Sequence, residues 1–138
     1  MKGNIIKLSI NNDKKYFEIY IDESRITFTN KDFDVTFIEI KENDVIDEDS
    51  FLDLDNQLYK SEDNDIFKNL PIYLLHYPKG TEINKSSGLI RRINDDNYTI
   101  EHVCDSSSGS SGGPIFNLKD LKVLGVHKGA AKEGKNGI

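Results

Sequence analysis

The chain has 138 residues, and its 18 basic and 24 acidic side chains give a net charge of −6. This length suits one domain with a real core and is too short for two. An acidic chain repels phosphate backbones, so we expect no nucleic-acid partner. No apolar run approaches the roughly 20 residues of a membrane span, so we expect no membrane partner, and the start lacks the features of a signal peptide. The lone Cys104 favours either a reducing compartment, for which we expect a cytoplasmic location, or a bacterial-style domain without disulfides.

Apolar and polar residues alternate along the first 41 residues. This period of two, carried by β-branched and aromatic side chains, predicts half-buried antiparallel strands. Turn-forming residues at 11–13 and 22–24 separate the strands, and a denser apolar strand is predicted at 35–40. Residues 1–41 therefore form a first cluster of strands.

The next segment, 42–69, is acidic. Ten Asp or Glu residues fall among the 24 positions from 42 to 65. A calcium loop would need oxygen ligands at alternate positions and a turn glycine, and this stretch has no glycine. We interpret it as a solvated connector.

The strand pattern returns in residues 70–138. Strands are predicted at 71–77, 88–93, 98–103, 114–117 and 122–126, with a hairpin turn at 94–97. No stretch has a helical period. The chain is predicted to be all-β, with two strand clusters joined by the acidic connector.

One segment between two of these strands carries the chemistry. It reads Gly109-Ser110-Ser111-Gly112-Gly113-Pro114. Its composition would suit a flexible linker, but it lies inside a β domain and continues directly into a strand. It resembles the Gly-X-Ser-Gly-Gly-Pro signature of the trypsin-like serine peptidase family, in its disulfide-free type.

The resemblance assigns roles to individual residues. Ser111 matches the nucleophile, and the N–H groups of Gly109 and Ser111 match the oxyanion hole, whose donors are worth roughly 3–4 kcal/mol each. Asp34, which opens the strand at 35–40, matches the aspartate that orients the catalytic histidine. The run from Gly125 to Gly129 resembles the strand edge that pairs with the substrate backbone, so Val126, His127 and Gly129 are the expected substrate-binding residues.

The resemblance also implies the fold. We expect an antiparallel double β-barrel that is incomplete at both ends, with residues 1–41 in the first barrel and 70–138 in the second.

The family's histidine lies upstream of the aspartate, whereas His76, His102 and His127 all follow Asp34. We interpret His76 as a packed strand residue and His102 as a partly buried hydrogen-bonding residue. A truncated gene product is our first explanation; a degenerate relative and strands supplied by another chain are the others.

Two residues give conflicting indications of specificity. Asp105 occupies the place of the pocket floor that selects Lys or Arg in trypsin-type enzymes. A histidine at the place of His127 helps to bind acidic side chains in glutamyl endopeptidases. We interpret Asp105 as a structural or pocket-wall residue and predict no cleavage preference.

The sequence therefore predicts a serine endopeptidase that forms an acyl-enzyme on Ser111 and acts on polypeptides, without metal or cofactor. This chain alone should have little activity, because the general base is not among its residues. The alternative is a non-catalytic module that binds extended peptides by strand addition. A histidine encoded upstream of Met1 would favour the enzyme.

Overall fold

The computed structural model describes residues 4–10, 14–57, 60, 64–94 and 99–129. It divides into two compact units, Met1–Phe51 and Leu52–Ile138, and each is described by itself. All the strand-to-strand pairings are antiparallel, and the helices within the described residues are short 3-10 turns. None of these is long and apolar enough to cross a membrane. The prediction of an all-β chain is confirmed.

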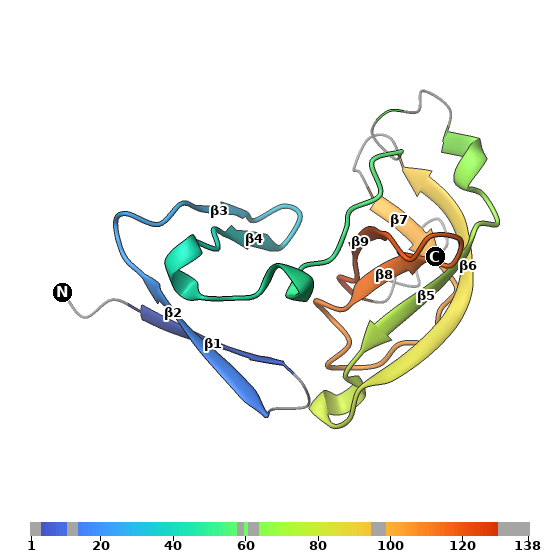
Figure 1. Cartoon of the computed structure of the whole chain (residues 1–138). Helices are drawn as coiled ribbons and strands as arrows, with labels where there is room; N and C mark the ends of the chain where they lie inside the picture. The colour runs from blue at the N-terminus through green and yellow to red at the C-terminus, as the bar shows by residue number, and fades with distance from the viewer. Residues whose placement is uncertain (1–3, 11–13, 58–59, 61–63, 95–98, 130–138) are drawn as a thin grey trace. The chain divides into compact units, whose positions relative to one another are not determined.

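The first unit consists of two hairpins and two 3-10 turns. Strand β1 (Asn4–Ile10) pairs with β2 (Lys15–Ile21), and β3 (Thr27–Asn30) pairs with β4 (Val35–Ile38), as Figure 1 shows. The turns η1 (Glu42–Asp44) and η2 (Glu48–Ser50) follow. Isolated two-stranded hairpins are marginal in water, so contacts between these elements must stabilise the unit.

A buried ion pair provides the main polar contact of the first unit. Both terminal nitrogens of Arg25 donate to the Asp44 carboxylate at 2.7 Å, and both side chains are less than a tenth exposed. The same guanidinium donates to the carbonyl oxygens of Tyr20 and Glu39. Arg25 thereby joins the end of β2, the segment after β4 and η1.

The second unit is built on one antiparallel sheet of five strands in the order β7-β6-β5-β8-β9. The strands are β5 (Pro71–His76), β6 (Asn84–Asn94), β7 (Thr99–His102), β8 (Pro114–Asn117) and β9 (Val123–Val126). Figure 1 shows β6 as a long, curved strand, so the sheet bends as part of an incomplete barrel. The 3-10 turns η3 (Asn64–Phe67) and η4 (Pro78–Gly80) flank β5.

The predicted strands of this unit match the observed ones with one exception. Strand β8 has the predicted bounds, β5 and β9 differ from the prediction by one residue at one end, and β7 ends one residue before the predicted end at 103, while the predicted start at 98 lies outside the described residues. Strand β6 begins at Asn84, four residues before the predicted start at 88. Of the hairpin turn predicted at 94–97, Asn94 ends β6 and 95–97 lie outside the described residues.

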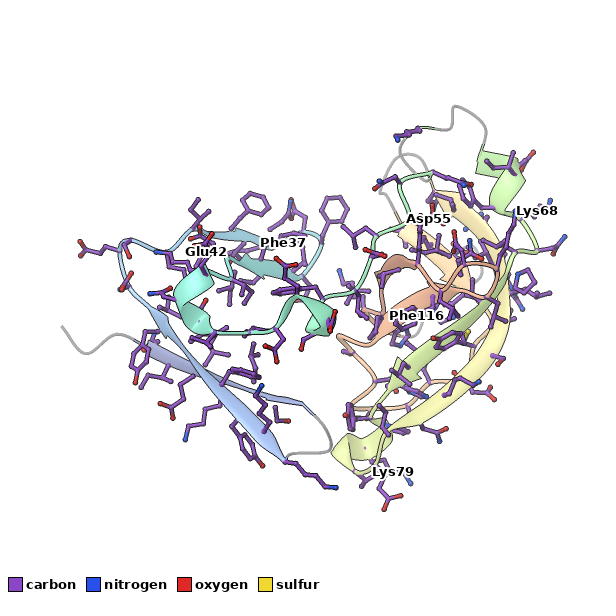
Figure 2. The ribbon with its side chains drawn as sticks, in the orientation of Figure 1. Phe37, Glu42, Asp55, Lys68, Lys79 and Phe116 are labelled. Atoms are coloured by element: carbon purple, nitrogen blue, oxygen red, sulfur yellow. The ribbon has the colours of Figure 1, made fainter. Side chains whose placement is uncertain are left out.

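The core of the second unit lies on one face of the sheet. Along β5 the buried residues alternate, and Ile72 and Leu74 are fully buried. The cluster is completed by Phe67, Ile90, Cys104, Ile115 and Leu124. On the other face Tyr73 stacks on its cross-strand partner Phe116, with ring centroids 4.8 Å apart. Figure 2 labels Phe116 in this sheet. The alternation that buries Ile72 and Leu74 also turns His76 inward.

The division between the units falls inside the predicted connector. Residues 53–55 belong to the second unit and hydrogen-bond with β9: the N–H of Val123 donates to the Asp53 carbonyl, and the N–H of Asp55 donates to the Val123 carbonyl, both at 2.8 Å. The Asp55 carboxylate is buried and accepts a hydrogen bond from the Asn117 amide at 3.2 Å. The boundaries 1–41, 42–69 and 70–138 remain a prediction.

Candidate active site

The segment between β7 and β8 is a hydrogen-bonded turn. The N–H of Ser110 donates to the Ser107 carbonyl at 3.0 Å, and the N–H of Gly113 donates to the Ser110 carbonyl at 3.2 Å. The N–H of Lys79, in η4, donates to the Ser108 carbonyl at 2.6 Å. These bonds fix the turn internally and tie it to the end of β5, which a linker would not require.

Two glycines of the turn are required by close backbone approach. A Cβ on Gly109 would lie 2.8 Å from the Gly80 nitrogen and 2.9 Å from the Tyr77 oxygen, and Gly109 has a φ of +90°. A Cβ on Gly113 would lie 2.5 Å from the Leu75 carbonyl oxygen. Real Cβ atoms are not found at such distances from backbone atoms, so only glycine fits at either position.

Ser111 is exposed at the tip of this turn. Its hydroxyl donates to the Lys128 carbonyl at 2.9 Å. Within the described part of the chain, the N–H groups of Gly109 and Ser111 donate to no acceptor. Two unbonded amides beside a hydroxyl are what an oxyanion hole needs.

The segment after β9 runs next to the turn. The N–H of Gly112 donates to the His127 carbonyl, and the N–H of His127 donates to the Gly113 carbonyl, both at 2.8 Å. His127 is buried, whereas Val126 is exposed and a Cβ on Gly129 would meet open space. The structure thus brings the predicted substrate-edge residues 126–129 beside Ser111.

The three histidines have partners other than the Ser111 hydroxyl. The Nδ1 of His76 lies 2.7 Å from the Oγ of Ser110, and both side chains are buried. The sequence predicted His76 as a packed strand residue, which is confirmed, but it gave no sign of this partner. Because Ser110 is only 1% exposed, a substrate cannot reach its hydroxyl, and the pair is no catalytic dyad.

His102 and His127 bond to each other. The N–H of Cys104 donates to the Nδ1 of His102 at 3.1 Å, so the ring proton of neutral His102 is on Nε2, which lies 3.2 Å from the Nδ1 of His127. Burial lowers the pKa of His102, and the neighbouring His127 lowers it further. Burial also lowers the pKa of His127, with His76 as a second cause. The prediction that His102 is a partly buried hydrogen-bonding residue is confirmed.

Residues 18–137 match the family model described as Peptidase S39, which is a family of serine peptidases with a chymotrypsin-like fold. The chain belongs to the Peptidase S39 family. No match was found among curated proteins or among solved structures. Membership makes the protein a peptidase, with polypeptides as its class of substrate.

Within this member of the S39 family, Asp34 lies in the first unit. It is exposed, directly precedes β4, and has a φ of +55° in the turn closed by its N–H to the Lys31 carbonyl. Ser111 lies in the second unit. The pairing of Asp34 with the nucleophile's site remains a prediction.

Asp105 begins the segment that leads to the nucleophile turn of this S39 chain. It is exposed, and its carbonyl accepts a hydrogen bond from the Ser86 hydroxyl at 2.7 Å. It lines a cavity of about 450 Å³ between the end of β5, the start of β6 and residues 105–107. Among the residues that the structure describes, no three metal-ligating side chains form a metal site.

Proposed function

We propose that this S39 peptidase is a serine endopeptidase whose nucleophile is Ser111. The observation that carries the proposal is the turn itself, which holds an exposed hydroxyl next to two amides, those of Gly109 and Ser111, that have no acceptor among the described residues. Acyl transfer needs these two features together.

The reaction follows from this arrangement. The Oγ of Ser111 attacks the peptide carbonyl carbon, its proton passes to a base, and the carbonyl oxygen becomes an oxyanion facing the N–H groups of Gly109 and Ser111. The amine then leaves with that proton, and water hydrolyses the acyl-enzyme. The substrate backbone would lie along residues 126–129, which flank the turn.

The general base in this proposal is an imidazole from outside residues 1–138. His76 is buried against Ser110, and His102 and His127 are bonded to each other. Moving any of them to the Ser111 hydroxyl would break a buried hydrogen bond. Asp34 would orient the external imidazole.

The buried, unpaired Cys104 supports the further proposal of a reducing, cytoplasmic compartment.

A fluorophosphonate probe tests the assignment. It should be applied to the protein expressed from its coding sequence, including any part upstream of Met1, and the labelled site should be located by mass spectrometry. We expect labelling on Ser111 that Ser111→Ala abolishes. Ser108→Ala, the same change at an exposed position of the same segment, should leave the rate unchanged. Labelling that survives Ser111→Ala would refute the proposal.

A second candidate is a non-catalytic module that binds extended peptides. It is favoured by one observation, the hydrogen bond from the Ser111 hydroxyl to the Lys128 carbonyl, because that bond occupies the nucleophile. The two functions differ in the fate of a bound peptide. Binding without cleavage or labelling would favour the module.

A further inference from the structure

The buried pair formed by Ser110 and His76 lies next to the proposed nucleophile. The Ser110 side chain is 1% exposed, the His76 side chain is 5% exposed, and the atoms Oγ and Nδ1 are 2.7 Å apart. Burying two polar groups costs free energy unless each finds a partner. A serine directly before Ser111 is therefore held in place by a residue of β5 that lies 34 positions away in sequence.

The direction of this hydrogen bond follows from the partners of Ser110. Its Oγ accepts a hydrogen bond from the N–H of Ser107 at 3.0 Å. A hydroxyl has one proton to donate, and within the described residues the acceptor in reach is the Nδ1 of His76. Ser110 therefore donates to His76, and the ring proton of neutral His76 is on Nε2.

Ser110 has all three of its polar groups bonded inside the turn. Its N–H donates to the Ser107 carbonyl, its carbonyl accepts from the N–H of Gly113, and its hydroxyl bridges Ser107 and His76. The peptide planes on either side of Ser110 cannot rotate without breaking one of these bonds. The plane between residues 109 and 110 carries the Gly109 carbonyl, and the plane between residues 110 and 111 carries the N–H of Ser111. The N–H of Gly109 lies one plane earlier, where the Ser108 carbonyl accepts from the N–H of Lys79.

We propose that Ser110 and His76 are a positioning pair that sets the direction of the Ser111 amide. This inference rests on the proposed function of Ser111. The pair acts through the backbone: Ser110 is 1% exposed, and His76, although only 5% exposed, also lines the cavity beside Asp105. The His76 bond anchors the turn to the inward face of β5, whose other inward residues form the core.

Four variants test the pair. Ser110→Ala removes the donor, and His76→Leu removes the acceptor while it keeps most of the bulk. His76→Asn keeps an acceptor near the place of Nδ1. The double variant Ser110→Ala/His76→Leu removes both side-chain partners, and the N–H of Ser107 is then the one group of this cluster that loses its acceptor. Losing one buried partner leaves the other unsatisfied, whereas losing both can be nearly neutral for stability.

Two measurements are made on each variant, in the protein expressed from its coding sequence with any part upstream of Met1: urea unfolding, and the rate at which a fluorophosphonate labels Ser111. We expect Ser110→Ala and His76→Leu to slow labelling by about 10- to 100-fold, below the usual loss of a whole oxyanion donor. His76→Asn should restore much of the rate. The double variant should regain stability over His76→Leu but stay slow. A double variant that labels at the wild-type rate would overturn the proposal, because the pair would then be only structural.

Nuclear magnetic resonance separates this proposal from the proposed function. In the wild-type chain the ring ¹⁵N shifts of His76 should show a bare Nδ1 and a protonated Nε2. His76→Leu, a change 35 positions from Ser111 in sequence, should move the amide signal of Ser111 and leave those of β7 in place. An unmoved Ser111 amide signal would contradict the positioning role. A wild-type protein that shows the expected ¹⁵N shifts but does not react with the fluorophosphonate would contradict only the proposed role of Ser111.

Discussion

At the scale of single residues, adjacent glycines of the nucleophile turn have different reasons to be glycine. A Cβ at Gly113 would strike the Leu75 carbonyl oxygen at 2.5 Å, whereas a Cβ at Gly112 would meet nothing within 4 Å, although Gly112 has a φ of +86°. The clash at Gly113 involves backbone of β5, which cannot move alone. For Gly112→Ala, the only cost is therefore the strain of placing a residue with a side chain at a positive φ.

We therefore predict unequal losses of stability. Gly113→Ala should lower the free energy of unfolding by about 3 kcal/mol, the upper end of the usual overpacking cost, and Gly112→Ala by about 1 kcal/mol. Urea unfolding followed by circular dichroism measures both. Equal losses of unfolding free energy in the two variants would contradict the close approach of the β5 backbone to Gly113.

The single thiol should be unreactive in the folded protein. Cys104 is 8% exposed, and burial raises the pKa of its thiol, so little of the nucleophilic thiolate exists near neutral pH. We expect Ellman's reagent to react slowly with the native chain and rapidly in urea. A fast stoichiometric reaction of the native chain would contradict the burial of Cys104.

Sequence reasoning reached some of these residues and not others. Ser111 and Gly109 were predicted as site residues because residues 109–114 resemble the Gly-X-Ser-Gly-Gly-Pro signature of the trypsin-like serine peptidases. The hydrogen bond between His76 and Ser110 could not be predicted, because it depends on which face of β5 turns inward and on how the 105–113 turn folds back. No local sequence pattern indicates that the His76 and Ser110 side chains are in contact.

At the scale of elements, side-chain alternation predicted strands where one face is buried. Strand β5 alternates between buried and less buried residues along its length, and its bounds were predicted closely. The start of β6 was missed because residues 84–87 are polar or small and carry no alternation of apolar side chains. They are strand only because their backbone pairs with β5, from His76–Asn84 to Tyr73–Ser87. Pairing of this kind is a tertiary effect.

The ion pair between Arg25 and Asp44 predicts how the first unit responds to acid. The hydrogen bond from Arg25 and the one from the Lys41 N–H lower the pKa of Asp44 from 3.8 to about 2. A carboxylate with a lowered folded-state pKa contributes stability that is fully present above its unfolded pKa. That contribution is lost as the pH falls toward the folded value.

We expect the amide protection of β3 and β4 to decrease as the pH falls from about 4 to about 2, over the interval between the two pKa values. Hydrogen exchange read by nuclear magnetic resonance measures this. Asp44→Asn should weaken protection already at pH 5 and remove much of the pH dependence below it. A pH dependence unchanged by Asp44→Asn would assign the acid response to other carboxylates, such as Asp22.

At the scale of the whole molecule, the two residues proposed as catalytic belong to different units: Asp34 to the first and Ser111 to the second. The general base is proposed to be an imidazole from outside residues 1–138, and free imidazole can be added in solution. If the site is otherwise complete, free imidazole should enter the place of the general base and accept the Ser111 proton. The 138-residue chain is therefore sufficient for the test.

We predict that added imidazole raises the rate at which a fluorophosphonate labels Ser111 by about tenfold, well below the contribution of a tethered base, and that the increase saturates. Ser111→Ala should remove all labelling. Asp34→Asn should lower the rescued rate, because a neutral amide no longer stabilises the imidazolium that forms. Asp49→Asn, the same change at another exposed acid of the first unit, should not. Equal rates in the two Asn variants would exclude Asp34 from the site, whereas a rate that falls only with Asp34→Asn would support its proposed role.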